Sequence, residues 1–101
     1  MEFHKLVRDK IPEMIEAQGE KALYKILDSA AFTHALEKKL DEEVAEYHAN
    51  KEPEELADIL EVVFALAEAN GCTRDELLAL YRTKNEKRGG FARRIFLIAK
   101  E

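Results

Sequence analysis

The chain has 101 residues, of which 47% are apolar and 37% charged, and its formal net charge is −5. The apolar content excludes a disordered acidic tail, and no apolar run approaches the roughly 20 residues that span a bilayer. The negative balance argues against general affinity for nucleic acid. With only four glycines and two prolines, the chain favours long helices, and we expect a single domain over residues 1–101.

The N-terminal sequence and the number of cysteines indicate in which cellular compartment the protein is expected. Residues 1–5 show no long apolar region of the kind found in a signal peptide. Cys72 is the single cysteine, which excludes an intrachain disulfide and favours a reducing environment. We therefore expect a cytoplasmic protein with no membrane partner.

The first half of the chain predicts two helices. A short helix over 12–18 has a proline in its first turn and ends at a glycine. A long helix over 30–49 follows, capped by Asp28 or Ser29.

The second half predicts two more helices. Proline opens a helix over 53–69, and an Asn-Gly pair ends it. Thr73 and Glu76 have the spacing of a capping box, so a further helix begins there and runs to about Arg88.

Two short apolar runs are predicted to be strands. Residues 22–27 lie between a glycine and an aspartate, and residues 95–99 form a continuous apolar run. Since an isolated strand pair is marginally stable, we expect the two to pair with helices behind them. The predicted fold is therefore mainly α, an antiparallel helix bundle with a small two-stranded β element.

Acidic residues fall on two different sides of the predicted helices. A rotation of about 100° per residue places Glu43 inside the apolar face of the 30–49 helix, with Glu46 beside it. On the 53–69 helix, Glu55 lies within the apolar arc and Asp58 at its edge. The opposite, solvated side of that helix holds Glu54, Glu61 and Glu68.

The short 50–53 loop makes these helices antiparallel neighbours. Glu46 then lies level with Glu55, and Glu43 level with Asp58, so four carboxylates converge with no lysine or arginine facing them. Like charges this close protonate or bind a cation, and oxygen ligands favour Mg²⁺, Mn²⁺ or Ca²⁺ over zinc. The alternative is an acidic hairpin with a slightly different rotation, in which they do not converge.

Three motifs are similar to those of one enzyme superfamily. Residues 42–46 (EEVAE) and 55–58 (ELAD) resemble the EExxE…ExxD signature of the MazG-type all-α nucleoside triphosphate pyrophosphohydrolases. Residues 5–12 (KLVRDKIP) and 88–91 (RGGF) resemble a predicted house-cleaning branch of that superfamily. Only eight residues separate Glu46 from Glu55, fewer than in many relatives, which leaves the base of the substrate open.

The resemblance implies a nucleotide substrate, cut between its α and β phosphates, and a Mg²⁺ cofactor, with Mn²⁺ as a substitute. The implied metal ligands are Glu43, Glu46, Glu55 and Asp58. Glu42 or one of these four accepts the proton of the attacking water. Phosphoribosyl-ATP pyrophosphohydrolase shares the superfamily pattern and is the same-class alternative. A non-catalytic helical interaction module is the alternative of another class.

A basic stripe completes the predicted site. On the 73–88 helix, Lys84 and Arg88 continue the inward apolar stripe of Leu77, Leu80 and Tyr81, and Asn85 lies beside them. They suit a polyphosphate, although cations near a helix C-terminus also stabilise the helix itself. By the resemblance, Arg8 is the best phosphate-binding candidate near the N-terminus.

The 53–69 helix also predicts self-association. Its apolar residues spread over roughly 200°, wider than the arc of somewhat over 100° on an ordinary surface helix. We expect a homo-oligomer, most simply a dimer packed through this helix, unless the two predicted strands cover the excess.

Overall fold

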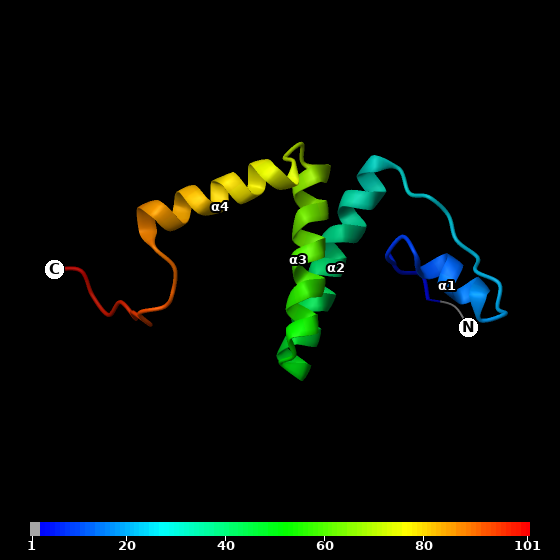
Figure 1. The fold of residues 1–101 in the computed structure, drawn as a ribbon, viewed down its shortest axis with the longest axis horizontal. Helices are drawn as coiled ribbons and strands as arrows, with labels where there is room; N and C mark the ends of the chain where they lie inside the picture. The colour runs from blue at the N-terminus through cyan, green and yellow to red at the C-terminus, as the bar shows by residue number, and fades with distance from the viewer. Residues whose placement is uncertain (1–2) are drawn as a thin grey trace.

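The computed structural model describes residues 3–101 and is mainly helical (Figure 1). All four predicted helices are confirmed, with ends within one residue of the predicted ones. Within the described residues, no helix is both long and apolar enough to cross a membrane. The elements in chain order are α1 (Ile11–Ala17), α2 (Ser29–Asn50), α3 (Pro53–Ala69) and α4 (Arg74–Arg88).

The helix ends are fixed by local hydrogen bonds. Asp28 caps α2, because its carboxylate accepts a hydrogen bond of 2.8 Å from the backbone N–H of Ala31. At the start of α4, the Thr73 hydroxyl accepts from the N–H of Glu76, and the Glu76 carboxylate accepts from the N–H of Thr73, both at 3.1 Å. The hydrogen bond from the Thr73 backbone N–H, followed by an interaction with the Thr73 side chain, holds the pKa of the Glu76 carboxyl below its usual value.

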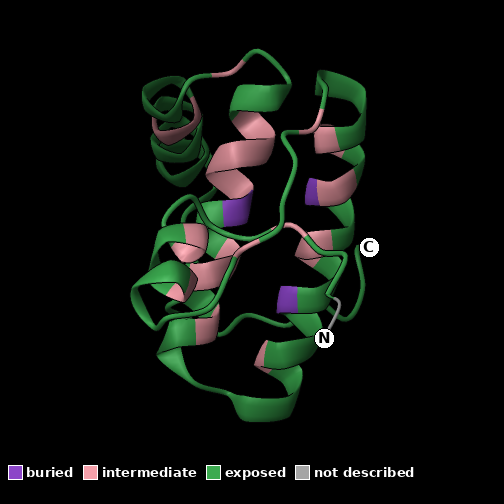
Figure 2. Ribbon diagram, turned by 90° about the vertical axis from the view of Figure 1, so that its right-hand side faces the viewer, coloured by how far each residue is buried: buried purple, intermediate pink, exposed green. Residues whose placement is uncertain are grey.

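The hairpin of α2 and α3 is the packed part of the molecule. Lys51 ends α2 in a left-handed conformation, with φ of 58° and its N–H donating to the carbonyl of Tyr47 at 2.7 Å. This tight reversal makes the two helices antiparallel neighbours, as predicted. The buried residues, Leu36 and Glu43 on α2 and Val62 on α3, all belong to this hairpin (Figure 2).

The rest of the chain extends away from the hairpin. α4 packs against α3 alone among the helices, and Figure 1 shows it running outward from the end of α3. The molecule measures 62 × 31 × 22 Å and has a radius of gyration of 17.8 Å, against about 13 Å for a compact domain of this length. One chain therefore forms a packed hairpin, α2 and α3, from which the N-terminal segment with α1 and the C-terminal segment with α4 extend.

The predicted two-stranded β element is wrong for the single chain. No residue in 3–101 is in a strand, and the segments 22–27 and 95–99 lie on opposite sides of the hairpin (Figure 1). A strand needs a neighbouring strand to receive its backbone hydrogen bonds, and neither segment has one here. Ile26 and Ile98 remain 87% and 92% exposed.

The predicted inward stripe of α4 is also wrong over most of its length. Leu77 is half-buried, but Leu80 and Tyr81 are 59% and 60% exposed. The physical reason is that α3 is the only helix that contacts α4 among the described residues, so the rest of the apolar stripe is left uncovered in a single chain.

We predict that Thr73→Ala weakens α4 through loss of its cap. A cap of this kind contributes about 1 kcal/mol, which corresponds to about 4–8 °C in the melting temperature of a domain this size. Thermal melting followed by the helical circular dichroism signal measures the loss. Thr83→Ala, an exposed substitution within α4, is the control and should melt at or slightly above wild type. Equal melting of Thr73→Ala and wild type would contradict the assigned cap.

Candidate functional site

Glu43 is a charged residue within the packed interface of the hairpin. It lies two turns after Leu36 on the same face of α2, and only 7% of its surface is exposed. One carboxylate oxygen, Oε1, lies 3.5 Å from Nζ of Lys39. The other, Oε2, is buried and has no hydrogen-bond partner. A buried acceptor without a partner is costly, which makes this oxygen a candidate contact for a ligand.

The electrostatic surroundings of Glu43 identify its neighbours. Burial raises the pKa of Glu43, and the negative charges of Glu46 and Asp58 raise it further, against the opposing effect of Lys39. Glu46 comes from α2 and Asp58 from α3, so charges from both helices act on one carboxyl group. The structure thus brings two other predicted ligands, Glu46 and Asp58, within electrostatic range of Glu43.

Asp58 is held by the N-terminal segment. The Arg8 guanidinium donates to Oδ1 of Asp58 at 2.7 Å, which joins residues 50 positions apart (Arg8 is exposed and Asp58 half-buried). The prediction that no lysine or arginine faces these carboxylates is therefore wrong. Lys39 reaches Glu43 from one turn earlier on α2, and Arg8 arrives from outside the hairpin.

The remaining predicted acids have local partners or face solvent. Glu55 is half-buried and accepts a hydrogen bond of 2.9 Å from the side-chain amide of Asn50 across the loop. Glu46 is exposed, and Glu42 is exposed with its Oε2 at 3.6 Å from Nζ of Lys39. The outer acids Glu54, Glu61 and Glu68 are exposed, as predicted.

The donor chemistry of this cluster fits a hard divalent cation. Carboxylate oxygens are the ligands that Mg²⁺ and Mn²⁺ prefer, and the unpartnered oxygen of Glu43 would gain a partner from such an ion. Among residues 3–101, however, no three acidic, histidine or cysteine side chains are arranged to hold a metal. Arg8, Lys39 and Asn50 each contact a carboxylate of this cluster, so a bound cation would compete with these contacts.

The structure does not bring the predicted phosphate-binding residues of α4 to this cluster. Lys84, Asn85 and Arg88 are exposed and lie in the half of α4 that extends away from the hairpin (Figure 1). Arg8, in contrast, lies directly at the acidic cluster through its contact with Asp58.

Two polar residues at the cluster were not predicted from the sequence. Lys39 lies four residues before Glu43, the helical spacing at which opposite charges pair, so the spacing alone could have identified it. Asn50 bridges the end of α2 to Glu55, and no recognisable short motif signals that contact.

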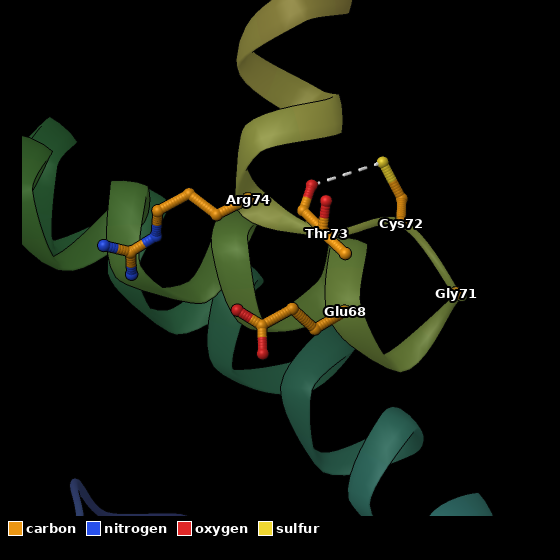
Figure 3. Close-up of a pocket in the computed structure, with 5 residues that line it drawn as sticks. All are labelled: Glu68, Gly71, Cys72, Thr73 and Arg74. Carbon is orange, nitrogen blue, oxygen red and sulfur yellow. Dashed lines mark hydrogen bonds between the residues drawn. The ribbon is translucent and has the colours of Figure 1, made fainter.

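A surface depression at the turn between α3 and α4 is a separate feature (Figure 3). It is lined by Glu68, Gly71, Cys72, Thr73 and Arg74. The Cys72 thiol donates to the Thr73 carbonyl at 3.6 Å, and the Arg74 guanidinium lies over the Phe64 ring, 4.1 Å from its centre. These groups serve the local structure, and they lie at the opposite end of α3 from Glu55 and Asp58.

Comparison with known proteins assigns no family. No protein-family model matches the chain, and no solved structure matches it. A stretch of 44 residues, 44% of the chain, is 50% identical to an uncharacterized protein of Mycolicibacterium smegmatis. The match covers 45% of the length of that relative.

We predict that Glu43→Gln stabilises the metal-free protein at neutral pH. Because the pKa of Glu43 is raised in the fold, the folded state loses stability as pH rises from the ordinary glutamate value through this raised pKa. The neutral amide removes that loss. Each 1 kcal/mol regained corresponds to about 4–8 °C in melting temperature.

The measurement is thermal melting of wild type and Glu43→Gln from pH 4 to pH 8 in the presence of a chelator. The difference between the two should grow with pH and shrink toward zero at pH 4. Glu54→Gln, an exposed carboxylate on the outer side of α3, should track wild type throughout. A Glu43→Gln protein that melts below wild type at pH 8 would contradict the assigned electrostatics.

Proposed function

We propose that the protein hydrolyses a nucleoside triphosphate to the monophosphate and pyrophosphate, with Mg²⁺ as cofactor, as a house-cleaning enzyme of the nucleotide pool. The observation that supports this most is the buried Glu43 carboxylate, which has one unpartnered oxygen and is repelled by Glu46 and Asp58. A carboxylate kept in such a position costs stability, and functional sites are where such costs concentrate. The choice of this particular reaction rests on the resemblance of the acidic motifs to those of the MazG-type enzymes.

The cofactor would be held from both helices of the hairpin. Glu43 and Glu46 of α2 and Glu55 and Asp58 of α3 are the proposed ligands of Mg²⁺ or Mn²⁺. When bound, such an ion neutralises phosphate charge and lowers the pKa of a coordinated water.

The side chains of the chain itself supply positioning and proton transfer. Glu42, exposed beside the cluster, or one of the four ligands accepts the proton of the attacking water. The water oxygen bonds to phosphorus in line, the bridging P–O bond between the α and β phosphates breaks, and pyrophosphate leaves. Arg8 is placed to exchange Asp58 for a phosphate oxygen, because a guanidinium binds carboxylate and phosphate with the same geometry.

Self-association belongs to the same proposal. Leu56 and Leu60, one turn apart on α3, are each 51% exposed, so an apolar stripe of this helix lies outside the packed interface. A second copy packed along α3 would cover it and form a four-helix bundle from two hairpins. We propose such a dimer in the cytoplasm, with the nucleotide as the small-molecule partner.

We predict that Glu43→Gln and Asp58→Asn each abolish Mg²⁺-dependent pyrophosphate release while the helical circular dichroism signal is retained. Each change removes one proposed metal ligand with little change of shape. Pyrophosphate release from a panel of standard and damaged nucleoside triphosphates, and from phosphoribosyl-ATP, is the assay. Glu61→Gln, an exposed residue 3.7 Å from Arg74, should keep wild-type activity. No pyrophosphate release by wild type from any of these substrates would favour the non-catalytic interaction module.

Lys84 and Arg88 lie away from the cluster within one chain (Figure 1), so they reach the triphosphate only if α4 of one copy meets the hairpin of the other in the proposed dimer. On that arrangement we predict that Lys84→Ala and Arg88→Ala each raise KM for the triphosphate or lower kcat by about tenfold, the effect of roughly 1.4 kcal/mol of lost phosphate binding. Lys87→Ala, the neighbouring base off the stripe, is the matched control and should change little. Steady-state kinetics and melting temperatures of the three variants separate the two roles of these cations. Lower melting temperatures with unchanged kinetics would contradict a role in phosphate binding and would show that these cations only stabilise the C-terminus of α4.

A further inference from the structure

Two apolar segments of the chain lie in solvent at opposite sides of the molecule. On one side, Leu23 and Ile26 are 92% and 87% exposed. On the other, the four residues from Ile95 to Ile98 are between 70% and 92% exposed. Alternate residues of a strand point to opposite faces, and both faces of 95–98 are apolar, which is typical of a strand covered on both sides.

The two segments cannot meet within one chain while α4 keeps its direction. Six residues, 89–94, join the end of α4 to the C-terminal segment, and an extended chain covers at most about 3.3–3.6 Å per residue. The reach is therefore about 20 Å, in a molecule 62 Å long whose two apolar segments flank the hairpin (Figure 1). A turn between Phe91 and Arg94, closed by a 3.0 Å hydrogen bond, also shortens this connection.

We propose that residues 95–99 of one chain pair as a β-strand with residues 22–27 of a second copy, in a reciprocal exchange of C-terminal segments. The strand pair that the sequence predicts then forms between chains instead of within one. This inference goes beyond the proposed hydrolysis and does not depend on it.

Charge favours a second copy as the occupant. Residues 82–101 contain seven bases and two acids, a net of +5, whereas residues 37–61 of the hairpin contain three bases and ten acids, a net of −7. A C-terminal arm that crosses to residues 22–27 of another chain passes the acidic hairpin of that chain. Opposite charges at this crossing speed association and fix its direction.

The apolar area that the exchange would bury is also close to that of a stable protein interface. Tyr24 and Phe96 can each bury about 150–250 Å², and the exposed aliphatic residues of both segments add to this. Exchange buries both segments of each chain, so it approaches the roughly 800 Å² per partner of a stable interface. An unpaired apolar segment such as 95–98 is otherwise a site of aggregation.

Cross-linking between two different chains tests the exchange. In a Cys72→Ser background, one chain carries Lys25→Cys and a second, distinguishable by a tag, carries Leu97→Cys, so each chain has a single thiol at the centre of one segment. The two chains are co-expressed and treated with a short bismaleimide. We expect a product that contains both chains, at up to roughly half of the material, because mixed dimers are half of a random population.

Asp75→Cys is the matched control for Lys25→Cys, since it is exposed but lies at the start of α4. It should give at least tenfold less of the linked product. A linked yield no higher than this control would overturn the proposal.

A second experiment separates exchange from closure within one chain. When Lys25→Cys and Leu97→Cys are placed in the same chain, exchange predicts a product of twice the 11.6 kDa chain mass. A product of single-chain mass would overturn the proposal in favour of closure. Light scattering over a dilution series should give a dimer for wild type. Removal of residues 95–101 should raise the dissociation constant of that dimer at least tenfold, with the helical signal retained, because only the α3 contact is left. An unchanged dissociation constant after this removal would also overturn the proposal.

Discussion

The carboxylate of Glu43 is buried between α2 and α3, and the cost of burying it constrains how the hairpin packs. The hairpin buries only two apolar residues, Leu36 and Val62, and yet it places a glutamate among them. An apolar residue at this position would pack without the cost of removing a charge from water. Lys39 compensates one oxygen, while Glu46 and Asp58 add repulsion. The fold therefore gives up stability at the point where carboxylates from two helices meet.

The contacts around this carboxylate explain how such a cluster persists. Arg8 holds Asp58, Asn50 holds Glu55, and Lys39 lies between Glu42 and Glu43. Each of these partners donates a hydrogen bond or lends positive charge to a carboxylate oxygen. A divalent cation would stabilise the same oxygens by coordination, with a larger charge. In the proposed metal-bound state these contacts would give way to the cation, and Arg8 would move from carboxylate to phosphate.

The single chain is extended for the same reason that its core is small: it has too little apolar area to bury. Among residues 3–101 the buried side chains all belong to the hairpin, while α4 packs on α3 alone and both apolar segments extend into solvent. A chain of about 100 residues has little apolar area to spare for a self-sufficient core, and here much of that area faces solvent. Association of two copies would supply the cover that the chain lacks, through α3 and through the exchanged segments.

What the sequence predicts well is local, and what it predicts poorly depends on distant parts of the chain. The cap at Asp28, the Thr73–Glu76 box and the prolines fix the helix ends, and the helical rotation places Glu43 inward. The contact of Arg8 with Asp58 joins residues 50 positions apart, and helical spacing carries no information about it. The strands failed for a related reason, because a strand is defined by its neighbour and the neighbour is absent from the single chain.

Measurement of Mn²⁺ binding tests directly whether the Glu43 cluster holds a metal ion. Free Mn²⁺ has a resolved electron paramagnetic resonance signal, and its loss on titration with protein counts the bound ions without any assumption about substrate. We expect at least one Mn²⁺ bound per wild-type chain, displaced by excess Mg²⁺, and affinity for Mn²⁺ at least tenfold weaker in Glu43→Gln. Equal Mn²⁺ affinity in the two proteins, or no binding by wild type, would contradict it.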